Sequence, residues 1–178
     1  MKRFFLLLSI LLISCDLEIP EQVYDDPLDL DYNASKGIYP PAFIFSPDRI
    51  TVNSGINQSV AIHALEVDSI AGAHIQIAYD KNKVDINTIT QGDWIINSNQ
   101  QPIFFVEKDN QSGIIDIYYS ILGDDEATAG SGVVAYLLFN TLSPGQHLIQ
   151  ITNKTSAVKR DQQQIILNGL GSLALDSQ

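Results

Sequence analysis

The residues that could do chemistry in this sequence are few and scattered. Cys15 is the only thiol, and the three histidines, His63, His74 and His147, do not have a zinc-binding spacing. The chain contains neither a G-x-S-x-G motif for a serine nucleophile nor a G-x-x-x-x-G-K-[ST] motif for phosphate. Paired carboxylates for glycoside cleavage stay open as an alternative, because such acids can come from distant segments. We therefore predict a protein that is not an enzyme and has no cofactor.

An acidic turn is the weak candidate for a cation site. Asp124, Asp125 and Glu126 follow Gly123 and supply three carboxylates. Calcium usually takes six or more oxygen ligands, so we favour a solvated turn over a calcium site. The sequence predicts no metal centre.

Two further sets of residues suggest binding. Trp94 could stack on a sugar ring, although a single tryptophan in a domain of this size more often packs in the core or at an edge. Two strands with alternating apolar residues direct five other side chains outward: His74, Gln76, Asp116, Tyr118 and Ser120. Adjacent strands would join them into one protein-binding surface, and an ordinary solvated face is the alternative.

The N-terminal residues of the chain have the pattern of an export signal. Met1, Lys2 and Arg3 precede an apolar run over 4–13 that is too short to span a bilayer, for which about 20 residues are needed. The sequence Leu12-Ile13-Ser14-Cys15 resembles the lipobox of bacterial lipoproteins, in which the thiol is alkylated by diacylglycerol and the chain is cut before it. The resemblance implies a lipid anchor on Cys15 and a location at the bacterial envelope, facing the periplasm or the exterior.

Charge and texture divide the rest of the chain into two parts. Residues 15–41 are acidic and contain four prolines, which is typical of an extended tether. Residues 42–178 form the predicted domain, after the signal segment 1–14 and the tether. The formal charge of −11 repels phosphate backbones, so nucleic acid is not an expected partner.

The domain has the texture of many short strands. Runs rich in Ile, Val, Phe and Tyr alternate with turn residues such as Asn53-Ser54-Gly55 and Ser143-Pro144-Gly145. Period-two alternation predicts three buried sets: Ala73, Ile75, Ile77 and Tyr79; Ile115, Ile117, Tyr119 and Ile121; and Val133, Ala135, Leu137 and Phe139. The third strand is apolar on both faces, which indicates a central position. We predict eight or nine strands in a sandwich or barrel, and no helix after Pro47.

Several segments in order resemble cohesin domains over about residues 48–175. They are SVAIHALEVDSIAGAHIQIAYD (59–80), Val84-Asp85-Ile86 with Gln91-Gly92-Asp93, GIIDIYY (113–119), GVVAYLLF (132–139) and IILNGLGSLAL (165–175). The resemblance implies an all-β fold, a nine-stranded jelly-roll sandwich related to carbohydrate-binding modules.

The same resemblance implies what the domain does. In cellulosomal cohesins one sheet face grips the dockerin of a partner enzyme, and polar residues begin the third strand. Here Gly72 and His74 stand where Asn and Asp are common, so a carboxylate and an amide are missing. We predict a lipid-anchored module that binds a protein partner, such as a dockerin-like domain. Polysaccharide binding is the alternative function, and a structural lipoprotein of the envelope is the third hypothesis.

Overall fold

A computed structural model describes residues 26, 29–96, 102–122 and 127–178 of the chain. This part contains two short helices and twelve strands. The number exceeds the eight or nine strands expected because four of the twelve are only two to four residues long. The elements are α1 (Leu30–Ser35), β1 (Ala42–Ser46), β2 (Arg49–Val52), β3 (Gln58–Tyr79), β4 (Val84–Gln91), α2 (Asp93–Ile96), β5 (Ile103–Asp109), β6 (Ile114–Ser120), β7 (Thr128–Thr141), β8 (Gly145–Ile151), β9 (Ser156–Lys159), β10 (Gln164–Ile165), β11 (Gly169–Leu170) and β12 (Ser172–Ser177).

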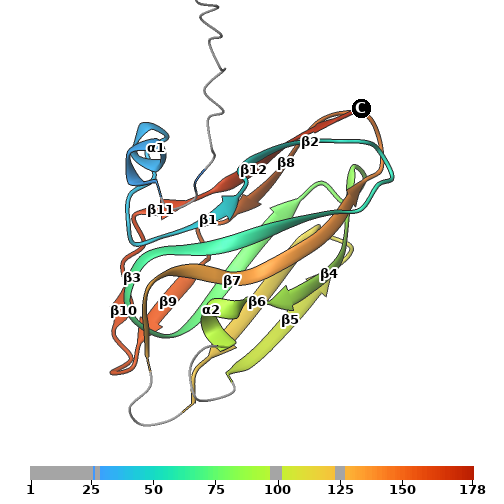
Figure 1. Ribbon diagram of the computed structural model, residues 1–178. Coiled ribbons are helices and arrows are strands. Elements are labelled where there is room, and N and C mark those ends of the chain that lie inside the picture. Colours follow the sequence, from blue (N-terminus) through green and yellow to red (C-terminus); the bar gives the residue numbers. More distant parts are fainter. Residues whose placement is uncertain (1–25, 27–28, 97–101, 123–126) are drawn as a thin grey trace, which may run out of the picture.

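The long strand β3 belongs to both layers of the sandwich (Figure 1). Its first half pairs with β1 and β7, and its second half pairs with β6, β8 and β9. Between the halves the register to β7 shifts, and Glu66 and Ser69 have positive φ angles of 44° and 51°. Such residues bend a strand sharply. Residues 58–79 therefore form one continuous strand with a bend inside it.

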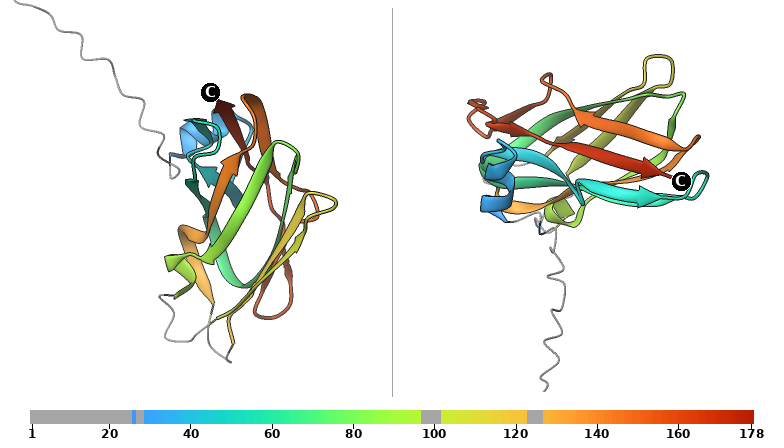
Figure 2. Two further views of the ribbon diagram at one scale, coloured as in Figure 1. Left: turned by 90° about the vertical axis from the view of Figure 1, so that its right-hand side faces the viewer. Right: turned by 90° about the horizontal axis from the view of Figure 1, so that it is seen from above.

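Two layers are stacked around the core (Figure 2). One has the order β11, β1, β3, β7 and β4, and the other has the order β5, β6, β3 and then β8 and β9. β12 pairs with β8 on one side and with β2 on the other, and this extends the second layer. The predicted central position of 132–139 is confirmed, because β7 lies between β3 and β4.

The core consists of the alternating apolar residues that the sequence predicts. The sets on β3 and around β6 are buried, as are Ala135, Leu137 and Phe139 on β7. The prediction is wrong for Val133, which is partly exposed, whereas Val134 is fully buried. The cause is a β-bulge: Ile62 pairs with Ala135 and the next residue of β3 pairs with Val133, so one extra residue reverses the alternation.

Helix α1 is formed by residues that were expected to be extended tether. The carboxylate of Asp29 accepts a hydrogen bond from the backbone N–H of Tyr32 at 2.9 Å and caps the helix. Asn33 is buried, the Tyr32 hydroxyl donates to Asp48 at 3.2 Å, and Lys36 forms an ion pair with Asp48. The chain from residue 29 onward thus packs on the β1 layer. Among the described residues, neither helix is long enough to cross a bilayer.

Candidate functional site

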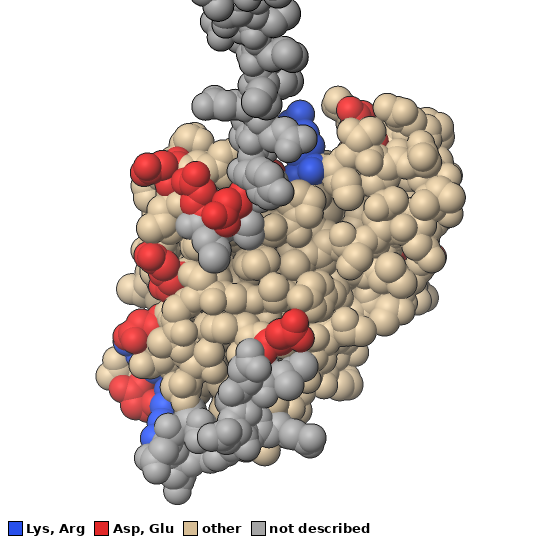
Figure 3. Space-filling view, in the orientation of Figure 1, with Lys and Arg blue, Asp and Glu red and all other residues tan. Residues whose placement is uncertain are grey.

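Three of the five predicted surface residues, Asp116, Tyr118 and Ser120, are on β6 and lie beside β5, a strand that sequence reasoning had not included. We define the β3–β6–β5 face as the outward side chains of residues 72–78, 114–120 and 103–109, with Ser156 and Val158 of β9 at its β3 edge. Its strands are antiparallel neighbours in the order β3, β6, β5. The opposite outer face of the molecule, over β3 and β7, has few charged groups in its middle, and acidic side chains gather along its edge (Figure 3).

Register arranges the β3–β6–β5 face in rows that run across the strands. The first row is Val158, Gly72, Ser120 and Ile103; the second is Ser156, His74, Tyr118 and Phe105; the third is Gln76, Asp116 and Glu107. Side chains in one row are direct cross-strand neighbours, and adjacent rows are about 7 Å apart because same-face residues are two positions apart. The prediction that His74, Gln76, Asp116, Tyr118 and Ser120 share one face is therefore correct in its geometry.

A hydrogen-bond network fixes the third row. Asp116 Oδ1 lies 2.6 Å from His74 Nε2 and accepts from Gln76 Nε2 at 2.9 Å. The Thr152 hydroxyl donates to Gln76 Oε1 at 2.9 Å. Gln76 faces outward but is only 8% exposed, because its side-chain amide is hydrogen-bonded within the protein.

The second row is a stack of rings. His74 and Tyr118 are nearly parallel, with centroids 4.6 Å apart and an interplanar angle of 9°, and Phe105 follows at 6.2 Å from Tyr118. Phe105 is 56% exposed, although a phenyl ring gains most from burial. Loss of solvent, followed by the nearby carboxylates of Asp116 and Glu107, raises the pKa of the Tyr118 hydroxyl. This hydroxyl therefore stays neutral and can donate a hydrogen bond.

The first row borders a hollow of about 380 Å³ on this face. Ile103 and Val158 line it with apolar side chains, and Ile103 is 53% exposed. Gly72 keeps it open, since a Cβ there would lie 3.1 Å from the carbonyl oxygen of Tyr119 and 3.6 Å from Val158 Cγ2. Sequence reasoning missed Ile103, Phe105, Glu107 and Val158. The run of β-branched and aromatic residues Ile103-Phe104-Phe105-Val106, which is typical of a strand, was the available signal for the first two.

The other predicted sites are not joined to this face by any described contact. Trp94 is on α2, partly buried, and packs against the core. Asp124, Asp125, Glu126 and Cys15 lie outside the described residues. Within the described part of the chain, no group of three or more His, Cys, Asp or Glu side chains could hold a metal ion.

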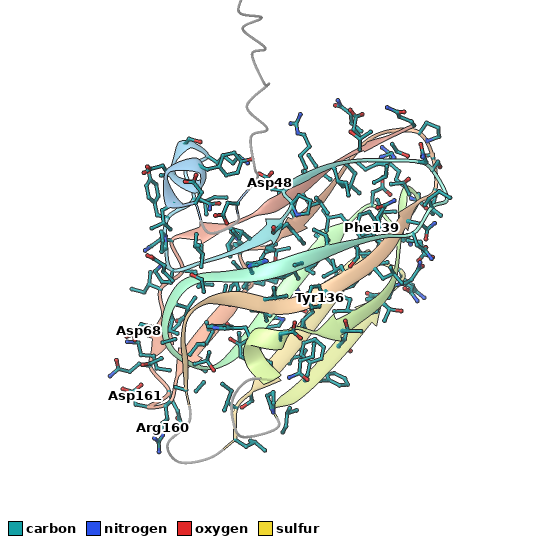
Figure 4. All side chains as sticks on the ribbon, in the orientation of Figure 1. Asp48, Asp68, Tyr136, Phe139, Arg160 and Asp161 are labelled. Carbon is teal, nitrogen blue, oxygen red and sulfur yellow. The ribbon has the colours of Figure 1, made fainter. Side chains whose placement is uncertain are left out.

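Trp94 sits over a glycine of β7. A Cβ on Gly132 would lie 2.3 Å from Trp94 Cγ and Cδ1, a distance that no side chain can tolerate. The Tyr136 hydroxyl donates to Asp93 at 3.4 Å and helps to hold α2 in place (Figure 4). This geometry favours packing over sugar stacking as the role of Trp94, and α2 corrects the prediction of no helix after Pro47.

A Gly132→Ala substitution should displace the indole. We expect the emission of Trp94, the only tryptophan, to shift to the red, and the free energy of unfolding to fall by about 1–3 kcal/mol, as for other overpacked sites. Fluorescence during urea unfolding measures both. Gly130→Ala is the control without a clash: the space around Gly130 is open, so a Cβ there strains only its positive-φ backbone and should leave the Trp94 emission unchanged. Unchanged Trp94 emission in Gly132→Ala would contradict the packing role.

Comparison with known proteins gives a consistent family signal. A model of the cohesin domain family matches residues 45–169. No curated protein sequence matches the chain.

Solved structures agree on the fold. A type I cohesin–dockerin complex from Clostridium thermocellum matches with a TM-score of 0.64 at 16% identity, covering 77% of this chain and 98% of that one. A type II cohesin domain from the cellulosome of Acetivibrio cellulolyticus gives 0.63 at 16%, covering 75% and 92%. A non-cellulosomal cohesin from the archaeon Archaeoglobus fulgidus gives 0.59 at 13%, covering 75% and 88%. The predicted all-β sandwich of this type is confirmed.

Proposed function

The chain belongs to the cohesin domain family, whose members are non-catalytic scaffolding modules, and we propose that it captures a protein partner on its β3–β6–β5 face. The observation that carries the proposal is the exposure of Ile103 and Tyr118 at one hollow, with the exposed ring of Phe105 beside Tyr118. Exposed aromatic side chains that surround a concavity are the usual centre of a protein interface.

The fixed polar network supports the same reading. Hydrogen bonds to Asp116 hold the side chains of His74 and Gln76 in place. These three side chains therefore lose little conformational entropy when a partner binds. Several structural relatives were solved as cohesin–dockerin complexes. We propose a dockerin-like protein as the partner, with contacts adapted to Gly72 and His74 in place of the Asn and Asp that are common at these positions.

We also propose that the module is held at the bacterial envelope by lipid on Cys15. The support is the Leu12-Ile13-Ser14-Cys15 sequence after a short apolar run. Helix α1 packs at the β1 and β11 end, where Ile38 contacts Gly169 (Figure 2). The first described residues therefore leave the β3–β6–β5 face uncovered, as a displayed binding module requires.

Capture by variants of the face tests the proposal. The full chain in detergent serves as bait for proteins of the source envelope and for its dockerin-bearing proteins, in parallel with a glycan array. We expect a protein partner whose Kd rises at least tenfold for the double variant Phe105→Ala and Tyr118→Ala. Both side chains are exposed enough that the fold should survive.

Leu148→Ala with Leu142→Ala is the matched control, since both leucines are exposed and lie outside the β3–β6–β5 face. The control should bind as the unaltered chain does. An equal loss of partner affinity in both double variants would contradict the proposal. Binding of a polysaccharide on the glycan array with no captured protein would contradict it as well. The second result would favour the carbohydrate-binding alternative.

A further inference from the structure

Two exposed apolar side chains lie at the end of the sandwich that is next to α1. Ile166 is 79% exposed, more than any other large hydrophobic residue that the structure describes, and Tyr39 is 55% exposed. We call these two side chains the Tyr39–Ile166 patch. Resting on the proposed lipid anchor at Cys15, we infer that this patch contacts the surface of the same bilayer and orients the domain on it.

Hydrogen bonds hold the two side chains of the patch on one edge. The backbone N–H of Asn168 donates to the carbonyl oxygen of Pro41 at 2.8 Å, and the side-chain amide of Asn168 donates to the carbonyl oxygen of Pro40 at 2.7 Å. Beyond these bonds β1 and β11 pair in parallel, beside α1 (Figure 1). Tyr39 directly precedes Pro40, and Ile166 is two residues before Asn168, so both belong to this fixed edge. A fixed edge loses little conformational entropy when it makes a contact.

The two segments that meet at this edge carry no charge. Residues 37–47 and 162–175 contain no Asp, Glu, Lys or Arg, although the chain has 21 acidic and 10 basic residues. An uncharged edge can approach lipid headgroups without removing water from an ion. Tyrosine is enriched at the membrane–water interface, because its ring is apolar and its hydroxyl can stay hydrated. Asp29 and Asp31, at the start of α1, favour zwitterionic over anionic lipid as the contact.

The length of the chain before α1 keeps the patch close to the bilayer. Thirteen residues separate Cys15 from Asp29, which is the N-cap of α1. Such a segment spans at most about 50 Å. The lipid anchor therefore gives the patch a high effective concentration of bilayer surface. Two side chains hold a protein on a bilayer only weakly by themselves, so the patch orients the anchored chain and does not replace the anchor.

This orientation leaves the β3–β6–β5 face open to a partner. On one side of β3 the strand order continues to β9 and β10, and on the other side it continues to β6 and β5. Ile166 directly follows β10, so the bilayer meets the β10 edge of this layer. At about 4.8 Å between neighbouring strands, β5 is roughly 19 Å from that edge. Tyr118 and Phe105 thus lie on the side of the layer that is remote from the lipid.

Spin labels on single introduced cysteines test the inference. Acylation occupies the thiol of Cys15, the only cysteine, so Ile166→Cys and Ile56→Cys each give one labelled site. Ile56 is the matched control, because it is 54% exposed but precedes β3, about 20 Å or more from the start of β1. On phosphatidylcholine vesicles that carry the acylated full chain, accessibility to a water-soluble nickel complex should be at least threefold lower in Ile166→Cys. Accessibility to oxygen, which concentrates in the bilayer, should show the reverse order.

A second pair of variants tests the patch without a label at Ile166. The label is placed in Tyr39→Cys, and Ile166→Asp is added to put a charge into the patch. Nickel accessibility of the label should then rise at least twofold, because a carboxylate resists transfer out of water. Ile56→Asp is the matched control and should leave this accessibility unchanged. All of these positions are exposed, so the fold should survive the substitutions.

The outcomes separate this inference from the proposed function. Equal nickel accessibility in Ile166→Cys and Ile56→Cys, on acylated and vesicle-bound chain, would overturn the inference alone. Dipolar broadening between Ile166→Cys labels that disappears on dilution with unlabelled chain would place a second copy on the patch and would also overturn it. A Cys15 without an acyl group, in a chain that does not sediment with the vesicles, would overturn the proposed anchor and the inference together.

Discussion

A Cys15→Ser variant should lose its membrane association almost completely. Serine has no sulfur for the thioether, so neither diacylglycerol transfer nor the cleavage that follows it can occur. Each buried methylene of an acyl chain contributes roughly 0.8 kcal/mol, and two chains are enough for stable anchoring. Labelling with palmitate in a bacterial host, followed by detergent partitioning and mass spectrometry of the N-terminus, measures the loss.

Ser14→Ala is the control for this experiment, because alanine keeps a small residue before the cleavage point. It should leave labelling unchanged. Palmitate incorporated into Cys15→Ser, or a Cys15 that carries no acyl group in the unaltered chain, would contradict the proposed anchor. Neither result would bear on the β3–β6–β5 face.

Phe139→Ala should destabilise the domain by about 3–5 kcal/mol, a range typical of a fully buried phenylalanine. Phe139 lies near the C-terminal end of β7, paired with Gln58 of β3 on one side and with Ile86 of β4 on the other (Figure 4). Both neighbouring strands are fixed by backbone hydrogen bonds, so the cavity cannot close easily. Urea unfolding followed by circular dichroism gives the difference.

The adjacent Leu138 is the matched control. It points to the other side of the same strand and is partly exposed, so Leu138→Ala should cost less than about 1 kcal/mol. A similar loss in both variants would mean that β7 does not separate a buried face from an exposed one. That outcome would contradict the register that the whole sandwich depends on.

Local pattern was enough to predict which side chains of two strands are buried. The alternation in 73–79 and 115–121 has the period of a strand with one buried face, and the structure buries those residues. The bulge at Val134 could not be predicted, because it depends on pairing with β3, which is distant in the chain. The bend in β3 and the docking of α1 on Asp48 also depend on long-range contacts.

The site was predicted in part for the same reason. His74 and Tyr118 were placed outward by alternation, and the structure stacks their rings. Alternation alone does not give the neighbour of β6, so Phe105 and Glu107 were missed until β5 was paired with it. The burial of Gln76 was missed because its cover comes from Thr152, 76 residues later.

Methyl cross-saturation between the captured partner and the labelled chain tests the central claim most directly. Saturation of the partner should reach the methyl groups of Ile103 and Val158, which border the hollow. Ile166 and Ile56 are at least as exposed but lie elsewhere, and their signals should not change. Transfer to Ile166 or Ile56 without transfer to Ile103 and Val158 would place the partner on another surface and contradict the account.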